Sequence, residues 1–260
     1  KRQIDDFARD GAVLVPGLFA GFVDLIAEGI EANMAEPGPY AAENLKAGET
    51  GRFFDDYCNW RRFRPYQEVI ADSPVGEVAA DLMASHTAKL FHDHVLVKEP
   101  GTSKATPWHQ DSPYYFVEGR QTVSFWCPVD PVGAATLRCV AGSHQWPRPV
   151  LPTRWLSEEN FYYNESAYMP VPDPDAEGME ILEWPMQPGD AVAFDFRVLH
   201  GARGNESLTR RRAFSLRLVG DDACYVDRPG RTSPPFPGHG MRPGERLRED
   251  WFPTIFRRQA

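Results

Sequence analysis

The sequence predicts a sheet-rich fold, a β-sandwich or barrel with helices packed outside it. After residue 87, apolar side chains recur with a period of two in several short segments, which is the spacing of strands. The 24 prolines and 21 glycines supply the turns that many short strands need. Because a chain of 260 residues suits one all-β or barrel domain, we expect residues 1–260 to form a single domain.

Helical spacing is found in the N-terminal part. Residues 4–9 are predicted to form a short helix, and the apolar run of residues 12–18 is predicted to form a strand. In residues 22–30 apolar side chains recur at helical spacing, before a Pro-Gly-Pro stop. Ser73 is expected to cap a further helix that has Pro74 at its first position.

Four segments are the predicted core strands. They are residues 89–98, 121–129, 191–199 and 212–219. The third alternates apolar side chains on one face up to its end, and His200 follows on that face. A histidine at the mouth of a barrel strand, followed by a glycine, is well placed to contribute to a metal site.

Two segments do not follow the strand rhythm. Residues 146–187 are rich in proline, tyrosine and acidic residues, and we interpret them as an inserted lid or binding loop. Residues 228–260 begin with a stretch crowded with Pro, Gly and Arg, and are expected to form a C-terminal tail that wraps over the surface. The alternative for both segments is structural decoration without a role in a site.

Composition excludes several classes of protein. The net charge of −9 argues against a nucleic-acid-binding surface, and no apolar run approaches the length of a transmembrane helix, so no membrane partner is expected. The four cysteines lie far apart without a Cys-x-x-Cys motif, which indicates neither a zinc knuckle nor a disulfide framework. We therefore expect a reduced, cytoplasmic protein with a small-molecule partner.

His109 and Asp111 are the sharpest local feature. Residues i and i+2 of an extended segment point the same way, so this imidazole and carboxylate would project together. With His200 they supply two histidines and one carboxylate, the ligand set of non-haem Fe(II) oxygenases, which leaves three metal positions open. Arg211 opens the next strand with Ser215 on its face, and can grip a carboxylate bidentately. Taken singly, a His-x-Asp pair can arise by chance and Arg211 can belong to a solvated basic run.

Further local patterns agree with one known family in their order and spacing. They are Gly11 to Gly17, Lys98-Glu99-Pro100-Gly101, Trp108-His109-Gln110-Asp111, Ala141-Gly142-Ser143-His144, Pro188-Gly189-Asp190, His200-Gly201 and Arg211. With these motifs the chain resembles the phytanoyl-CoA dioxygenase family of Fe(II)- and 2-oxoglutarate-dependent oxygenases. The resemblance spans residues 5–220 and is weakest in 146–187. The chain departs from the family's pattern at Ala141, where proline is usual, and at Ala202, where members place a serine.

The resemblance implies a distorted double-stranded β-helix (a jelly-roll, cupin-like barrel) with flanking α-helices. His109, Asp111 and His200 would bind Fe(II), and 2-oxoglutarate would chelate the metal with its distal carboxylate on Arg211. Trp126 would lie beside the co-substrate, although it also reads as a core aromatic. Without a serine at position 202, one hydrogen bond to the co-substrate would be either missing or supplied by Ser215. The reaction implied consumes O2, releases succinate and CO2, and hydroxylates an unactivated C–H bond. An aspartate at position 111 favours hydroxylation over halogenation.

Two rival hypotheses use the same barrel differently. In a cupin-type metalloenzyme His92, His94 and Glu99 would be ligands, with His200 as a distant fourth. In a binding or scaffold protein the fold would carry no catalysis at all. Measurements of iron content and of succinate formation distinguish these two hypotheses from the oxygenase.

The substrate is predicted from one aromatic and acidic segment. Aromatic faces beside a carboxylate suit an ammonium group, and arginines suit an anion at the other end of a zwitterion. We therefore expect a small zwitterion or amine, such as an aminoalkyl phosphonate or a betaine. The alternatives are an acyl-CoA substrate, which the acidic net charge disfavours, or core and surface roles for these residues. The candidate substrate residues are Asp55, Tyr57, Asn59, Trp60, His94 and Arg138.

Overall fold

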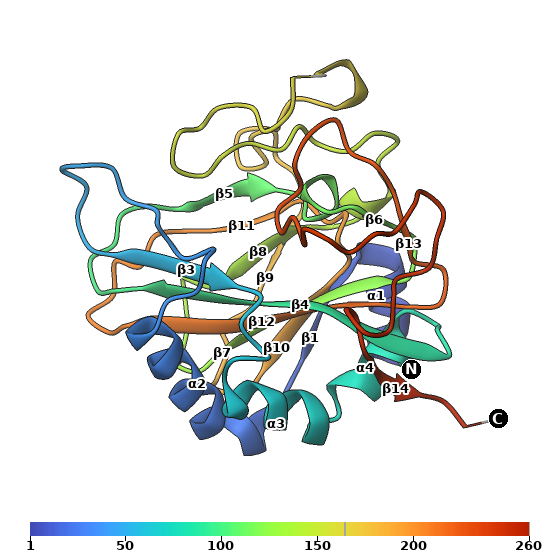
Figure 1. The fold of residues 1–260 in the computed structure, drawn as a ribbon. Coiled ribbons are helices and arrows are strands. Elements are labelled where there is room, and N and C mark those ends of the chain that lie inside the picture. The colour runs from blue at the N-terminus through green and yellow to red at the C-terminus, as the bar shows by residue number, and fades with distance from the viewer. Residues whose placement is uncertain (164, 260) are drawn as a thin grey trace.

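The structure is a computed structural model that describes residues 1–163 and 165–259. A large, mostly buried antiparallel sheet forms its centre, and a smaller sheet lies over one face (Figure 1). The large sheet has the order β1-β10-β7-β12-β4-β3-β2, with β14 also paired to β4. Its strands are β1 (Ala12–Val15), β10 (Ala191–Phe194), β7 (Thr122–Pro128), β12 (Arg211–Val219), β4 (Thr87–Lys98), β3 (Phe53–Tyr57), β2 (Ala42–Glu43) and β14 (Thr254–Arg257).

The smaller sheet carries the order β5-β11-β8-β9, and a separate two-stranded ribbon pairs β13 with β6. These strands are β5 (Thr106–His109), β11 (His200–Ala202), β8 (Leu137–Val140), β9 (Ile181–Glu183), β6 (Val117–Glu118) and β13 (Cys224–Tyr225). Short 3-10 helices are η1 (Ala20–Phe22), η2 (Ser112–Tyr114), η3 (Ser143–Gln145) and η4 (Glu165–Ala167). The predicted mainly β class with helices outside is therefore correct.

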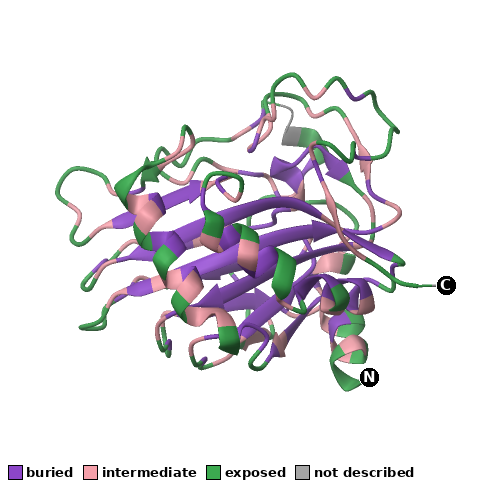
Figure 2. Ribbon diagram, turned by 60° about the horizontal axis from the view of Figure 1, so that its bottom comes forward, coloured by how far each residue is buried: buried purple, intermediate pink, exposed green. Residues whose placement is uncertain are grey.

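Helices cover the face of the large sheet that points away from the smaller one (Figures 1 and 2). They are α1 (Arg2–Asp10), α2 (Val23–Ala35), α3 (Arg64–Asp72) and α4 (Val75–Leu82). Figure 2 shows buried strands beneath helices whose outer faces are exposed. Helix α3 was not predicted. Because α3 ends at Asp72, Ser73 is its C-terminal cap, and Pro74 rather than Ser73 is the N-cap of α4. The Ser73 hydroxyl is buried and has no hydrogen-bond partner among the described residues.

The side chains of strand β12 alternate between the helix-covered core and the barrel interior. Phe214 and Leu216 point to the helical side, where the Tyr66 ring of α3 stacks on Phe214 with centroids 4.5 Å apart. Arg211 and Arg217 point to the opposite, inner side. This alternation is that of a strand with one face in the helical core and the other in the barrel interior.

The predicted strand over residues 191–199 is wrong in its second half. Strand β10 ends at Phe194, because Asp195 starts a turn in which its backbone and side chain bind Val198 and Arg197. Such local carboxylate-to-backbone bonds favour turns over strands. His200 therefore begins β11, in the smaller sheet, rather than continuing the strand.

No helix in the described part of the chain combines the length and apolarity required to span a membrane.

Candidate metal centre and substrate pocket

The three predicted metal ligands converge between the two sheets. His109 ends β5, His200 begins β11, and the two are register partners. Asp111 lies in the turn before η2 with φ −70° and ψ −42°, so this turn, rather than an extended segment, brings its carboxylate beside His109. The two histidine Nε2 atoms lie 3.6 and 3.7 Å from the same Asp111 Oδ1. All three ligand atoms lie within 4.8 Å of one another, so one small cation can contact them all.

Backbone carbonyls fix the tautomer of both histidines. His109 Nδ1 lies 2.8 Å from the carbonyl oxygen of Pro107, and His200 Nδ1 lies 2.9 Å from that of Val198. Because a carbonyl can only accept, each Nδ1 carries the proton and each Nε2 keeps its lone pair. Burial, reinforced by His109, lowers the pKa of His200 to about 3. His200 is therefore neutral at physiological pH, as a metal ligand must be.

Two partners hold the Asp111 carboxylate in place. Ser124 Oγ donates to Asp111 Oδ2 at 3.0 Å, and Arg217 Nε lies 3.4 Å from the same oxygen. Ser124 and Arg217 are register partners on β7 and β12. Burial opposes the charged carboxylate, but the adjacent Arg217 guanidinium outweighs it and holds the pKa of Asp111 well below its usual value. The third ligand is therefore an oriented anion.

Arg211 presents unused donors to the barrel interior. It is 2% exposed, its guanidinium carbon lies 5.4 Å from the Trp126 ring centre, and its Nη1 donates to Ala135 O at 3.2 Å. Arg211 Nε and Nη2 are buried and have no partner in the part of the chain that the structure describes. Burial lowers the pKa of Arg211 to about 10, so the group remains charged at neutral pH. A buried cation with open donors fits a carboxylate, as the distal end of 2-oxoglutarate requires.

Ser215 lies on the same inner face, between Arg211 and Arg217. Its hydroxyl donates to the carbonyl oxygen of Phe125 at 2.7 Å. The hydrogen of Ser215 is thus used within the sheet, and the hydroxyl can only accept from a ligand.

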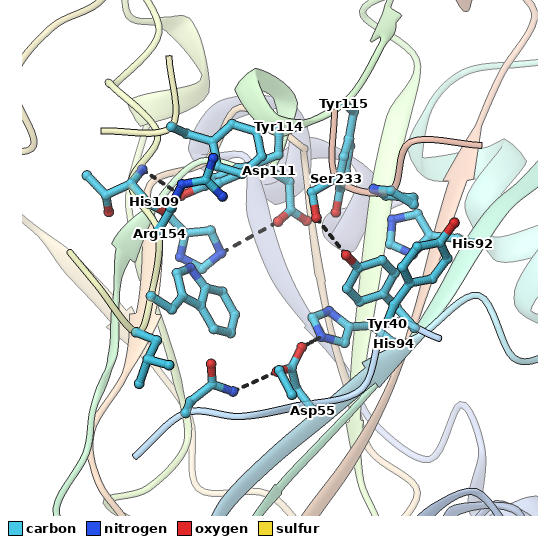
Figure 3. Close-up of a pocket in the computed structure, with 18 of the residues that line it drawn as sticks. Tyr40, Asp55, His92, His94, His109, Asp111, Tyr114, Tyr115, Arg154 and Ser233 are labelled. Carbon is cyan, nitrogen blue, oxygen red and sulfur yellow. Dashed lines mark hydrogen bonds and ion pairs between the residues drawn. The ribbon is translucent and has the colours of Figure 1, made fainter. Parts of the chain in front are cut away.

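A pocket of about 450 Å³ opens beside the triad (Figure 3). The segment 146–187, predicted to be a lid, contributes residues 153–157 and Phe161 to its wall. The C-terminal tail contributes Ser233 and Pro234, and the Ser233 hydroxyl lies 2.8 Å from that of Tyr57 on β3. Both segments therefore shape the pocket. Its aromatic wall consists of Tyr40, Tyr57, Tyr114, Tyr115, Trp155 and Phe161.

A buried carboxylate faces the pocket from β3. Asp55 Oδ2 accepts from His94 Nε2 at 2.8 Å, and Asp55 Oδ1 accepts from Asn44 Nδ2 at 2.6 Å (Figure 3). Burial lowers the pKa of His94, so the imidazole is neutral. The hydrogen-bonded pair of His94 and Asp55 therefore carries the negative charge of the carboxylate. Beside it the rings of Tyr40 and Tyr57 stack with centroids 4.9 Å apart.

The family follows from the sequence match. The family model described as Phytanoyl-CoA dioxygenase (PhyH) matches residues 7–213, most of the chain. The chain belongs to the phytanoyl-CoA dioxygenase family. A curated relative, "Probable phytanoyl-CoA dioxygenase" from Caenorhabditis elegans, is 29% identical over 184 residues, covering 68% of this chain and 54% of that protein. The chain thus spans about half the length of this relative.

Solved structures share the fold of this phytanoyl-CoA dioxygenase family member. The non-heme alpha ketoglutarate dependent epimerase SnoN from nogalamycin biosynthesis is 22% identical with a TM-score of 0.80, covering 98% of each chain. The carbocyclase SnoK from the same biosynthesis is 20% identical with a TM-score of 0.75, covering 98% of this chain and 96% of that chain. EctD from S. alaskensis is 18% identical with a TM-score of 0.67, covering 89% and 80%.

Three predicted substrate residues lie away from the pocket of this family member. The backbone N–H groups of Asn59 and Trp60 donate to the Asp93 carboxylate, which holds the turn after β3 and keeps both side chains off the pocket wall. Arg138 forms ion pairs with Asp175 and Glu183. Asn59, Trp60 and Arg138 are not among the residues that line this pocket, whereas Asp55, Tyr57 and His94 are.

The cupin-type ligand set is not assembled. Glu99 pairs with Arg210 at 2.7 Å, and His94 is engaged by Asp55. Within residues 1–163 and 165–259, the triad of His109, Asp111 and His200 is the only cluster of three histidine, cysteine or acidic residues spaced to hold a metal.

Sequence reasoning missed Ser124 and Arg217. The usable signal for Arg217 was a basic residue on the Arg211 face of an otherwise apolar strand. Nothing local to Ser124 distinguishes it, because its hydrogen bond to Asp111 joins β7 to the turn before η2.

Proposed function

We propose that this chain is an Fe(II)- and 2-oxoglutarate-dependent oxygenase that uses O2 to hydroxylate a C–H bond of a small organic substrate, with release of succinate and CO2. The observation that carries the proposal is the joint presence of a buried His-Asp-His triad and a buried arginine with unused donors. Membership of the phytanoyl-CoA dioxygenase family supports it. We also propose that the two sheets form a distorted double-stranded β-helix in a single domain.

The residues of the chain position and shield the reaction. Bound Fe(II) would supply the activation of O2 and of the 2-oxo acid. His109, Asp111 and His200 would hold the metal by one face and leave the other positions to co-substrate and oxygen. Arg211 would fix the orientation of 2-oxoglutarate. The lid and tail segments would exclude water from the pocket, which protects a reactive centre from side reactions. No side-chain general base is needed.

Asp55 is the proposed recognition group for an ammonium-bearing substrate. Its carboxylate holds two neutral donors and keeps lone pairs for a third, and the stacked Tyr40 and Tyr57 offer aromatic faces to a cation. Among the described residues that line the pocket, the arginines and lysines are Arg154 and Arg217, and Arg217 is held by Asp111. This lining favours an amine, a betaine or an aminoalkyl phosphonate over an acyl-CoA ester, whose phosphates need several cations.

Asp55→Asn tests this recognition. The substitution keeps the shape of the side chain and removes its charge, so turnover of ammonium substrates should fall about 10- to 100-fold, the value of one charge-assisted contact. The measurement is substrate-stimulated succinate release across a panel that pairs each ammonium compound with its carbon isostere, for example choline with 3,3-dimethylbutan-1-ol.

The matched control is Glu43→Gln, on the neighbouring strand β2, where an exposed carboxylate pairs with Arg52. It should leave all substrates unaffected. If Asp55→Asn lowered the turnover of the neutral isosteres as much as that of the ammonium compounds, recognition of the charge would be contradicted. Product analysis with 18O2 then checks hydroxylation against ring closure or epimerisation, the reactions named for SnoK and SnoN.

A further inference from the structure

Two polar atoms in the wall of the substrate pocket lack a hydrogen-bond partner. His92 on β4 and Arg217 on β12 are register partners, so their side chains start about 5 Å apart on the same inner face. His92 is 2% exposed, Arg217 is 5% exposed, and both line the pocket. His92 Nε2 and Arg217 Nη1 are buried and unpaired within residues 1–163 and 165–259. Burying such atoms unpaired is unfavourable, so we expect a bound group to complete them.

One of these atoms is an acceptor and the other is a donor. His92 Nδ1 lies 3.0 Å from the carbonyl oxygen of Asp93, so Nδ1 carries the proton and Nε2 keeps a lone pair. Burial, followed by the charge of Arg217, lowers the pKa of His92 well below its usual value, and the ring is neutral. Arg217 can only donate. Its Nε donates to the Tyr115 hydroxyl at 3.2 Å and lies 3.4 Å from Asp111 Oδ2, which leaves Nη1 for a ligand.

A hydroxyl group satisfies both atoms at once. Its hydrogen can bind His92 Nε2 while its oxygen accepts from Arg217 Nη1. A carboxylate has no hydrogen for the imidazole, and its lone pairs would face that of Nε2. An ammonium group cannot accept from the guanidinium and is repelled by its charge. An ether oxygen satisfies the guanidinium alone. The pair therefore selects a hydroxyl over the other common polar groups of a small substrate.

We propose that His92 and Arg217 bind a hydroxyl group of the substrate, and that the substrate is an amino alcohol whose ammonium group lies at Asp55. The inference rests on the proposed function and on its ammonium site. His92 and His94 are two residues apart on β4, so the hydroxyl and ammonium subsites start about 7 Å apart. The ring centre of Tyr57 lies 6.1 Å from that of His92 and 5.4 Å from that of His94, so one aromatic surface spans both subsites.

The two subsites also give the substrate a direction. Strand β4 lies between β12, which carries Arg217, and β3, which carries Asp55. Arg217 contacts the Asp111 carboxylate, so a hydroxyl bound to its Nη1 lies beside a metal ligand. The hydroxyl-bearing end of the substrate is therefore the end held on the metal side of the pocket (Figure 3).

A series of rigid benzylamines tests the donor and acceptor pair. 4-(Hydroxymethyl)benzylamine carries both groups on one flat ring, 4-methylbenzylamine lacks the hydroxyl, and 4-(methoxymethyl)benzylamine keeps the oxygen without its hydrogen. Each is titrated calorimetrically into anaerobic protein loaded with Fe(II) and 2-oxoglutarate. The alcohol should bind about 10- to 100-fold more tightly than 4-methylbenzylamine, with the ether between them. 4-(Aminomethyl)benzoic acid should bind less tightly than the alcohol, because its carboxylate offers no hydrogen to His92.

Variants of His92 assign the preference to its acceptor atom. His92→Phe keeps an aromatic ring beside Tyr115 and removes Nε2, so the alcohol should bind no more tightly than the ether. His92→Gln returns an acceptor oxygen and should restore part of the preference, which separates the hydrogen bond from a packing effect. The matched control is His86→Phe, at an exposed histidine directly before the same strand, and it should keep the full preference. A thermal melt of each variant reports folding.

The possible failures are distinguishable. A wild type that binds the alcohol no more tightly than 4-methylbenzylamine, or that binds neither, would overturn the hydroxyl site, and so would tighter binding of the carboxylate. An undiminished preference for the alcohol over the ether in His92→Phe would overturn the role of His92. Wild-type affinity of Asp55→Asn for the alcohol would contradict the ammonium site alone. An iron-loaded wild type that binds no 2-oxoglutarate would contradict the proposed function itself.

Discussion

Asp111→Ala is expected to lower both iron affinity and 2-oxoglutarate-dependent succinate formation by more than about 100-fold, since even losing an outer partner of a metal ligand typically costs 10- to 100-fold. Asp111 supplies the only carboxylate of the triad, and both histidine Nε2 atoms face its Oδ1. The substitution also leaves Arg217 buried without its anionic partner. Iron content and succinate yield are measured on the same preparation, together with a thermal melt that reports folding.

Ser124→Ala provides the graded comparison for Asp111. It removes the hydrogen bond to Asp111 Oδ2 and keeps the ligand oxygen that faces the histidines. Its losses should therefore be measurable but smaller than those of Asp111→Ala. If the alanine variant at position 111 kept its iron and its activity, the triad assignment would be wrong.

Arg211→Met is the second substitution with a large expected effect. The Arg211 guanidinium is a buried charged group with two open donors, Nε and Nη2, so its loss should raise the apparent KM for 2-oxoglutarate about 100-fold or more, the value of two charge-assisted hydrogen bonds. The KM of the organic substrate should change little, because Arg211 does not line the substrate pocket. Steady-state kinetics with each substrate varied in turn makes the comparison.

Arg210→Met is the matched control for Arg211. Arg210 is the preceding residue, and its side chain pairs with Glu31 and Glu99 outside the barrel interior. It should leave both KM values unchanged. Equal increases in the two KM values for Arg211→Met would indicate a general structural role instead.

The triad could be predicted because its signal is local. His109 and Asp111 lie two residues apart, so any tight backbone brings them together. The His200-Gly201 pair was a second local signal, although Gly201 lies within β11 rather than in a turn at a strand end. The predicted backbone conformation around these ligands was nevertheless wrong in two details. Asp111 lies in a turn, and Asp195 breaks the strand that was expected to carry His200. Patterns of apolar residues do not show such a break, because Phe196 and Val198 are buried in the turn as they would be in a strand.

The partners across strands could not be predicted from the sequence. The contact of Ser124 with Asp111 and the pairing of His94 with Asp55 depend on which segments the fold makes neighbours and, for β3 and β4, on their register. Conversely, Asn59 and Trp60 look like pocket residues because they follow Asp55 and Tyr57. The Asp93 carboxylate on the next strand turns their backbone away, and that contact has no signature in the segment itself.

The most direct measurement of the central claim is the visible charge-transfer band of an Fe(II)–2-oxoglutarate chelate, recorded without oxygen. The triad and Arg211 together predict that the wild type shows the band, and that both His109→Ala and Arg211→Met lose it at the same 2-oxoglutarate concentration. An iron-loaded wild type without the band would contradict the claim that this chain binds 2-oxoglutarate at the metal.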